Sequence, residues 1–547
     1  MNCYRHNGAG SWPFWALAVA YLVGVLTFFS PYRFFPTDDL FFQWPFLNDD
    51  GAAALEQAIN SHQPVYKLTL LAIKMIMKLG GQELTPAIFL CTAALSGAVI
   101  MLSLMFSVHA YARQGLLPLL AGVVFALSSW TATYFFFFSY GPLSSAFCMA
   151  SIALLVIASR GTSRRPQAFV LCAGAGLLMG FYFWSSPSSP VLAGLALLLP
   201  FFLWEGQGRD KLFAHGAFVV SELVVIAAFG VNSLPALVRH LEENVSANWY
   251  YKLASANIET SVDGEKWQPI LSFFQVALKV QAPVSVILFL SVLALTLVGH
   301  GMARKNPFAA NAATRSGMLL ACYFLAAGLL IDFLPTTKLG RTLFQLYPIM
   351  LLATFLLAAG FFQQATLPVP PKGICLLTVL ALCLIGLVVD GCKVYGLYRA
   401  RFALPEYLHE HFSGKPVYVI AEDSHAKWIG TSYLPEFDIR KIPLAAVQAL
   451  VTSSAEEIGI LIGPTEKNSS RMSIYLEPRN TDILQAEILA SAPALQEIEP
   501  VVLPFSALHP AFLMENEITQ ALSLLGLTPR WNSPASGLKL YAVKGDP

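Results

Sequence analysis

The amino-acid sequence predicts a polytopic α-helical membrane protein with about 11 transmembrane helices, followed by a soluble α/β domain at its C-terminal end. Only 12% of the 547 residues are charged, which is about half the share found in soluble domains. Apolar runs that approach the roughly 20 residues of a bilayer-crossing helix recur between Trp12 and Asp390. Beyond Cys392 these runs stop, and short apolar stretches alternate with polar segments. Much apolar surface is therefore expected to meet lipid as well as a protein core.

The first apolar run, from Trp12 to Phe29, follows a short polar lead that contains Arg5 and His6. Residues 30–33 read SPYR, so no small-residue cleavage site follows the run. We therefore expect it to be retained as the first span rather than removed as a signal peptide.

The remaining spans follow from the length of the apolar runs. The predicted set is 12–30, 86–108, 116–138, 142–159, 167–184, 188–204, 213–231, 280–299, 317–334, 343–362 and 373–391. The stretch 167–204 is nearly continuous, so the count is less certain there than the presence of the bundle.

Basic residues orient this bundle, because Lys and Arg are retained on the cytoplasmic side. With the N-terminus inside, the inward loops contain Arg113, Arg160, Arg164, Arg165, Arg209, Lys211, Arg304, Lys305, Arg315 and Lys372. The outward loops are then 31–85, 232–279 and 335–342, with two short turns near 139–141 and 185–187 that contain no Lys or Arg. The C-terminal domain also lies outside. For a bacterial inner membrane this means a cytoplasmic N-terminus and a periplasmic C-terminal domain.

The segment 67–79, KLTLLAIKMIMKL, carries Lys67, Lys74 and Lys78 on an apolar background. It is too short and too charged to span a membrane easily. We expect a helix in the outer interface, with its lysines reaching from the apolar layer toward water.

The chain is predicted to divide into a transmembrane domain, 1–392, and a soluble domain, 393–547. Predicted strands of the soluble domain are 415–421, 437–443 and 458–464, and helical stretches are 425–434 and 444–457. Strands that alternate with helices favour a mostly parallel sheet. The domain has no GxGxxG or P-loop pattern, so no nucleotide is expected.

Charge and cysteine usage exclude several other classes of protein. The net charge of +1 gives no reason to expect nucleic acid as a partner. The eight cysteines form no CxxC pair and no Cys/His cluster with metal spacing, and most lie in apolar runs. They are expected to be buried thiols rather than a disulfide framework.

Two acidic pairs stand in the first outward loop. Asp38 and Asp39 lie among phenylalanines shortly after the first span. Desolvation there disfavours the charged carboxylate, which makes the pair a candidate general base, although a solvated turn is the alternative. Asp49 and Asp50 could bind substrate, but Asp50-Gly51 also suits a cap for a helix over 52–60.

The last outward loop reads IDFLPTTKLGRTLFQLYP. Lys338 and Arg341 could hold a lipid phosphate, as a point charge beside a forked donor. The alternative is that they only anchor the loop at the interface. Tyr347, which follows, is a further candidate substrate contact.

The outward segment 232–279 begins with an apolar spacing typical of an amphipathic helix, over LPALVRHLEENV. Arg239 and His240 on it could contact substrate or could be its solvated face. Trp249 and Tyr250 could stack on a sugar ring, and the alternative is the aromatic belt of the membrane. Lys67, in the first outward loop, is a further possible substrate contact.

Together these features resemble the GT-C superfamily of membrane glycosyltransferases, which take a sugar from a polyprenyl-phosphate carrier at the outer face. The resemblance rests on Asp38-Asp39 after the first span, the amphipathic segment 52–79, and the basic and aromatic stretch from Lys338 to Pro348. A WWD motif of the oligosaccharyltransferase type is absent from the sequence.

The resemblance implies an inverting transfer in which Asp38 or Asp39 takes a proton from the acceptor, while Lys338 and Arg341 stabilise the leaving lipid phosphate. The acceptor would be an envelope glycan, a lipid or a protein. Some relatives use a divalent metal such as Mg²⁺ or Mn²⁺, and others use none.

Two other functions remain open at this point. A transporter or flippase for lipid-linked sugars would place ionisable residues inside its spans, as Glu222 is placed here. A polysaccharide or O-antigen polymerase or ligase would be expected to use basic residues of a large outer loop, such as Arg239 and His240.

Overall fold

The computed structural model of the chain describes the membrane-type helices almost completely and the C-terminal region in short pieces. The described residues are 11–28, 46–47, 51–81, 87–112, 116–128, 130–132, 140–161, 165–186, 189–204, 208–246, 274, 282–302, 311–333, 344–363, 369–420, 430, 434, 436–447, 449–450, 459–462, 495–497 and 539–543. The chain forms two compact units, which divide the long helix α19 at Gly391–Cys392. The first unit takes in 1–30, 42–248 and 268–391, and the second takes in the remainder.

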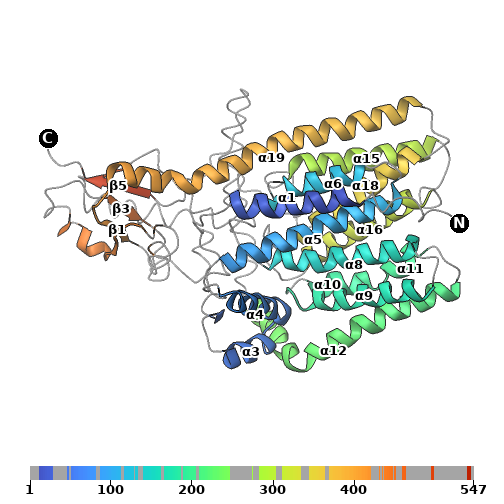
Figure 1. Cartoon of the computed structure of the whole chain (residues 1–547), viewed down its shortest axis with the longest axis horizontal. Helices are drawn as coiled ribbons and strands as arrows, with labels where there is room; N and C mark the ends of the chain where they lie inside the picture. The colour runs from blue at the N-terminus through green and yellow to red at the C-terminus, as the bar shows by residue number, and fades with distance from the viewer. Residues whose placement is uncertain are drawn as a thin grey trace. The chain divides into compact units, whose positions relative to one another are not determined.

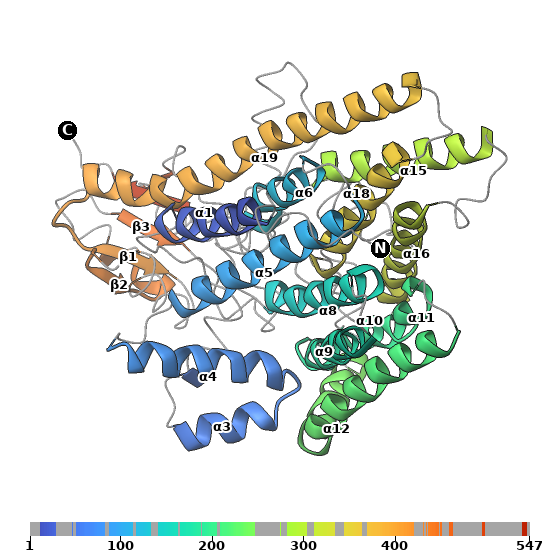
Figure 2. The ribbon, with the colours of Figure 1, turned by 45° about the vertical axis from the view of Figure 1, so that its right-hand side comes forward.

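The first unit is a helical bundle (Figure 1). Its elements are α1 (Trp12–Phe28), α3 (Gly51–Ile59), α4 (Pro64–Leu79), α5 (Ala87–Tyr111), α6 (Leu116–Ala126), α8 (Gly141–Gly161), α9 (Arg165–Phe183), α10 (Ser189–Ala196), α11 (Leu199–Leu203), α12 (Gly208–Ser246), α15 (Pro283–Met302), α16 (Ala312–Phe333), the 3₁₀ turn η5 (Phe344–Leu346), α18 (Tyr347–Gln363) and α19 (Val369–His411). Figure 2 shows α1, α5 and α8 side by side, with α9 and α12 beyond them.

Among the described residues, seven helices are long and apolar enough to cross a membrane, and four shorter apolar helices accompany them. Each predicted span coincides with one of these elements or with a consecutive pair. The membrane character of the chain is therefore borne out, while the number of crossings stays a prediction.

The helix α18 forms the centre of the bundle. Every residue from Tyr347 to Phe361 is buried, because α5, α6, α15 and α16 pack around it. At the periphery, α19 exposes Ile374, Leu377 and Val388. Exposed apolar side chains of this size suit contact with lipid.

Glycines bring two helix pairs into close contact. A Cβ atom added at Gly176 of α9 would lie 2.1 Å from the carbonyl oxygen of Phe218 on α12. One at Gly360 of α18 would lie 2.2 Å from the hydroxyl of Thr314 on α16. Small residues that let backbones approach in this way are typical of membrane helix interfaces.

Two boundaries differ from the sequence prediction. The stretch 188–204 is broken into α10 and α11, and Pro200 stands in the first turn of α11. The amphipathic segment expected after 231 is not a separate helix, because α12 continues through Pro235 to Ser246. A proline removes one backbone donor but is tolerated in a membrane helix where neighbours satisfy the freed carbonyl.

The second unit contains a five-stranded sheet of order β2-β1-β3-β5-β4. Its strands are β1 (Val417–Ile420), β2 (Ile439–Lys441), β3 (Gly459–Ile462), β4 (Leu495–Glu497) and β5 (Lys539–Val543). The three predicted strands are β1, β2 and β3, and they pair in parallel. The sheet is mixed rather than mostly parallel, because β5 pairs antiparallel with both β3 and β4. The stretch 425–434 lies almost wholly outside the described residues.

Candidate functional site

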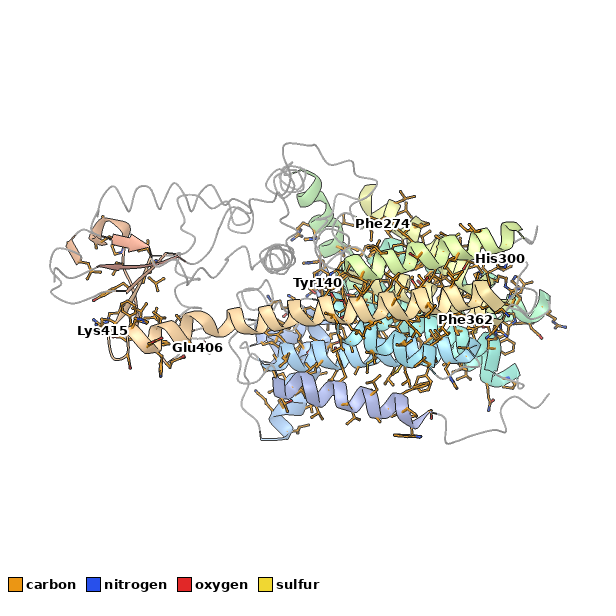
Figure 3. All side chains as sticks on the ribbon, turned by 90° about the horizontal axis from the view of Figure 1, so that it is seen from above. Tyr140, Phe274, His300, Phe362, Glu406 and Lys415 are labelled. Carbon is orange, nitrogen blue, oxygen red and sulfur yellow. The ribbon has the colours of Figure 1, made fainter. Side chains whose placement is uncertain are left out.

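The two ends of the bundle carry different residues. Figure 3 shows Tyr140 at one end, and His300 and Phe362 toward the other. Tyr140 immediately precedes α8 and belongs to a predicted outward turn, whereas His300 and Phe362 stand where α15 and α18 approach predicted inward loops. Helix ends predicted to lie on different sides are thus at different ends of the bundle, and which end faces the cytoplasm stays a prediction.

Residues predicted to be inward meet at one end. The guanidinium of Arg160 lies 4.3 Å from the ring centre of Tyr111. The hydroxyl of Tyr111 is 2.8 Å from that of Ser316, and the side-chain amide of Gln363 donates to the Tyr111 carbonyl. These contacts join α5, α8, α16 and α18, so the bundle is held together by polar contacts at its inward end.

The two long outward segments meet at the opposite end. The hydroxyl of Ser233 on α12 donates to the carbonyl of Ile59 on α3, at 2.6 Å. The rings of His62 and His240 stack, with centroids 4.1 Å apart and planes 3° from parallel. We call this contact of the α3–α4 segment with the C-terminal part of α12 the outer junction.

Apolar packing connects the outer junction to the bundle. Val65 of α4, Trp184 after α9 and Leu237 of α12 form one buried cluster. The rings of Tyr66 and Tyr140 meet edge to face, with centroids 6.4 Å apart. The first turn of α4 is thereby fixed against the outward ends of α8 and α9.

Two of the three lysines of α4, Lys67 and Lys74, contact other parts of the chain, whereas Lys78 is exposed. The ammonium of Lys67 lies 4.9 Å from the ring centre of Phe46, and burial lowers the pKa of Lys67. Lys74 is 8% exposed, and its ammonium donates to the carbonyl of Leu47. The expectation that Lys74 reaches toward water is therefore wrong, because a backbone carbonyl satisfies it inside. Met75 and Ile76 are exposed instead, so an apolar stripe of α4 is available to the membrane surface.

His62 is held neutral at the outer junction. Its pKa is lowered to about 3, chiefly by burial and to a smaller extent by the neighbouring His240 and Lys67. Because both of the groups that act on His62 are basic, a further positive charge is disfavoured beside it.

A polar network lies within the same end of the bundle. Gln345 of η5 is completely buried, and its side-chain oxygen accepts from the hydroxyl of Tyr182 at 2.6 Å. Its amide nitrogen donates to the hydroxyl of Ser186 at 3.0 Å. The residues of this network are far in sequence from those of the outer junction. The end of α9 connects the two, because Tyr182 belongs to the network and Trp184 belongs to the buried cluster with Val65 and Leu237.

Tyr347 belongs to the packed interior. Its ring centre lies 5.2 Å from that of Trp130 and 6.4 Å from that of Phe125. Its hydroxyl is 3.2 Å from that of Ser285, and the side chain is 0% exposed. This environment suits a structural aromatic cluster.

The structure describes four of the twelve predicted site residues. Lys67 and His240 come together at the outer junction, Arg239 is exposed beside them on α12, and Tyr347 is interior. The others lie outside the described residues: Asp38, Asp39, Asp49, Asp50, Trp249, Tyr250, Lys338 and Arg341. Within the described ranges, no group of three or more His, Cys, Asp or Glu side chains could hold a metal ion.

Sequence reasoning missed His62, Phe46 and Gln345. His62 stands two residues before the proline that opens α4, a place that predicts a turn and nothing more. Gln345 carried a usable signal, because it is a lone amide between apolar residues at the start of a predicted span.

No family model and no curated protein matches the chain. It is similar to the solved structure of ArnT from Cupriavidus metallidurans in the apo state, with a TM-score of 0.45 and 11% identity over 98% of this chain and 99% of that one. It is also similar to the Archaeoglobus fulgidus oligosaccharyltransferase tethered with an acceptor peptide, with a TM-score of 0.42 and 10% identity over 80% of this chain and 64% of that one. A third similar structure is the arabinofuranosyltransferase AftD from Mycobacteria, with a TM-score of 0.43 and 13% identity over 99% of this chain and 40% of that one.

Two of these three proteins are glycosyl-transferring enzymes by name, an oligosaccharyltransferase and an arabinofuranosyltransferase. The chain spans less than two thirds of the oligosaccharyltransferase and of AftD. Because identities are near 10% and TM-scores are below 0.5, no residue role or activity is transferred from these proteins.

Proposed function

We propose that the protein is a membrane glycosyltransferase of the GT-C type. It transfers a sugar from a polyprenyl-phosphate-linked donor to an envelope glycan, lipid or protein acceptor at the periplasmic face of a bacterial inner membrane. The reaction inverts the configuration of the anomeric carbon.

The observation that carries the proposal is the outer junction. Two outward segments that are far apart in the sequence pack together through the Ser233–Ile59 hydrogen bond and the stacked rings of His62 and His240. The α3–α4 segment follows Asp38 and Asp39 in the chain, so this packing supports a site that gathers at the outward end of the bundle.

In the proposed reaction the acceptor hydroxyl attacks the anomeric carbon while Asp38 or Asp39 takes its proton. The new glycosidic C–O bond forms as the bond between the anomeric carbon and the phosphate oxygen breaks, through an oxocarbenium-like transition state. Polyprenyl phosphate leaves with the electron pair, and Lys338 and Arg341 stabilise its negative charge.

The outer junction would contribute binding rather than proton transfer. Lys67 and His240 would face an anionic or hydroxyl-rich part of the substrate, with Arg239 beside them. Trp249 and Tyr250 would stack on a sugar ring, and Asp49 and Asp50 would bind its hydroxyls or cap α3.

One observation favours a transporter of lipid-linked sugars as the second candidate. Glu222 of α12 is buried inside a candidate span, and its Oε2 atom has no hydrogen-bond partner among the described residues. Acidic groups at such a place mark substrate or proton pathways in transporters.

Mass spectrometry of envelope glycans and glycoproteins, from cells with and without the gene, tests the proposed function. We expect one hexose or pentose to be missing from one acceptor in cells that lack the gene, with the sugar-loaded carrier still present at the outer face. A transporter predicts instead that the loaded carrier accumulates at the inner face.

A further inference from the structure

Two cations and two aromatic rings meet where α11 ends and α12 begins. The ammonium of Lys211 on α12 lies 4.0 Å from the ring centre of Phe201 on α11. The guanidinium of Arg209 lies 5.6 Å from the ring centre of Phe213, one turn further along α12. We call these four residues, together with Phe202, the α11–α12 corner. Figure 1 and Figure 2 show α11 and the start of α12 at the end of the bundle opposite to α3 and α4.

The corner is held in place by packing between three helices. The ring centroids of Phe201 and Phe202 are 5.5 Å apart, and that of His215 on α12 lies 6.2 Å from that of Phe201. The ring of Phe213 meets that of Phe169 on α9, also with centroids 6.2 Å apart. Edge-to-face contacts at these distances fix the rings relative to one another. The two cations therefore stand beside a surface that the fold itself has formed.

This surface is apolar and open. The three phenylalanines of the corner are exposed, and so are Leu198 and Leu212, which flank them in the sequence. Their exposed fractions lie between 39% and 63%. An exposed apolar patch on a membrane bundle suits the acyl chains of lipids, and cations at its edge then lie at the depth of lipid headgroups.

The cations of the corner are not neutralised by acidic side chains of the described part of the chain. Among the described residues, neither Arg209 nor Lys211 forms a salt bridge. Asp210 stands in the first turn of α12, where an acidic side chain suits the helix dipole. Two cations against one carboxylate leave these residues with a net positive charge. A ring face occupies only one side of a cation, so N–H donors on the other sides can bind an oxyanion.

We propose that the α11–α12 corner binds an acidic phospholipid. The lipid phosphate contacts Lys211 and Arg209, which supply a point charge and a forked donor. The acyl chains lie against the exposed phenylalanines of the corner. Basic pockets between membrane helices bind acidic lipid headgroups in this way. The inference does not rest on the proposed function, because it concerns a different ligand at the opposite end of the bundle from the outer junction.

The alternative is a general attraction between basic loops and an acidic membrane surface, in which every cation near that surface takes part alike. Lys372 separates the two readings. It stands in the first turn of α19 and belongs to another predicted inward loop. Among the described residues Lys372 contacts no aromatic ring, so it offers a charge without the built surface of the corner.

The test measures the thermal unfolding midpoint of the purified full-length protein in detergent, with graded amounts of phosphatidylglycerol. Phosphatidylcholine with the same acyl chains, inorganic phosphate and a polyprenyl phosphate are the comparison ligands. The variants are Lys211→Met and Arg209→Met, alone and together, and Lys211→Arg. Methionine keeps a long apolar stem beside the ring and removes only the charge, so these variants are expected to fold. Lys372→Met is the matched control.

We expect phosphatidylglycerol to raise the midpoint to a plateau and phosphatidylcholine to have little effect, because a choline cation neutralises its phosphate. Each single methionine variant should weaken phosphatidylglycerol binding about fivefold, and the double variant about 25-fold, since one cation near a lipid surface contributes roughly that factor. Lys211→Arg keeps the cation and should retain binding. Lys372→Met should bind as the wild type does.

Equal weakening in Lys372→Met and in the corner variants would show general attraction and overturn the site. Unchanged binding in the double variant, or equal stabilisation by phosphatidylcholine, would overturn it as well. Equal stabilisation by inorganic phosphate would assign the corner to a free anion. Tighter binding of the polyprenyl phosphate, lost in the corner variants, would assign it to the carrier lipid, and either result would contradict a phospholipid site.

Discussion

His62 lies between two other basic side chains, Lys67 on α4 and His240 on α12. Burial is the larger reason that its pKa falls to about 3, and the two basic neighbours add to the effect. The neutral imidazole can stack on His240, whereas an imidazolium would meet like charge in a place with little water. The outer junction therefore depends on His62 remaining unprotonated.

The sign of the pH dependence follows from the direction of this pKa shift. An unfolded or undocked His62 titrates near 6.5, so the open form binds more protons than the docked form between about pH 6.5 and 3. The contribution of His62 is fully present above about pH 6.5 and is lost as the pH falls toward 3. We expect hydrogen exchange in α3 and α4, corrected for the intrinsic rate, to be faster at pH 5 than at pH 7.5.

The variant His62→Phe keeps a ring that can stack and cannot be protonated, so its exchange should depend less on pH. Equal pH dependence in the wild type and in His62→Phe would show that another group controls the docking.

For single residues, the sequence shows which side chains are present but does not show which groups they contact. The lysines of 67–79 were visible, yet Lys74 binds the carbonyl of Leu47, a partner 27 residues away, and not water. The stacking of His62 on His240 depends on how α3, α4 and α12 pack, which local patterns do not contain. The acidic pair Asp38–Asp39 remains a prediction from the sequence.

At the scale of the elements, the glycines of the described residues show that the closest approach to another backbone is that of α9 to α12. Gly176 and Gly180, four residues apart, lie on one face of α9. A Cβ at Gly180 would lie 2.6 Å from that of Val225 and 2.9 Å from the Glu222 carbonyl oxygen. This pair of glycines sets the position of α12 and, through it, the outer junction.

The variant Gly176→Ala should be destabilised by about 1–3 kcal/mol, because its Cβ would meet the backbone of Phe218 rather than a flexible side chain. Gly174→Ala on the same helix is the control, since its Cβ would lie 3.5 Å from Leu154, in ordinary contact. Thermal unfolding of both variants in detergent measures the difference. Similar midpoints would contradict close backbone packing of α9 on α12.

Run length and hydrophobicity located the helices, because a helix that faces lipid must be apolar over most of its length. Helix ends were less predictable. The apolar run of α12 ends near Val231, but the helix continues for 15 residues more, to Ser246, on an amphipathic pattern. In the second unit, β1 to β3 had local strand signals, whereas the antiparallel pairing of β3 with β5 joins segments nearly 80 residues apart.

At the scale of the whole bundle, its two ends carry different sets of contacts. The Tyr111 contacts, which include Arg160, lie at one end, and the outer junction and the Gln345 network lie at the other. The charge rule then assigns the first end to the cytoplasm.

Cysteine labelling in intact spheroplasts tests this assignment, in a background without the eight native cysteines. Glu56→Cys on α3 should react with a membrane-impermeant maleimide, whereas Arg209→Cys at the start of α12 should react only after permeabilisation. Both positions are exposed, so the two variants differ in side and not in access to solvent. The reverse pattern would invert the bundle and remove the periplasmic site.

The central claim is that sugar transfer depends on the carboxylates after the first span. It is tested by envelope glycan mass spectrometry in cells that lack the gene and carry Asp38→Asn, Asp39→Asn, the double variant or Glu56→Gln as the matched control. The account predicts that wild type and Glu56→Gln restore the missing sugar and that the double variant does not, at equal membrane levels. Full restoration by the double variant would contradict it.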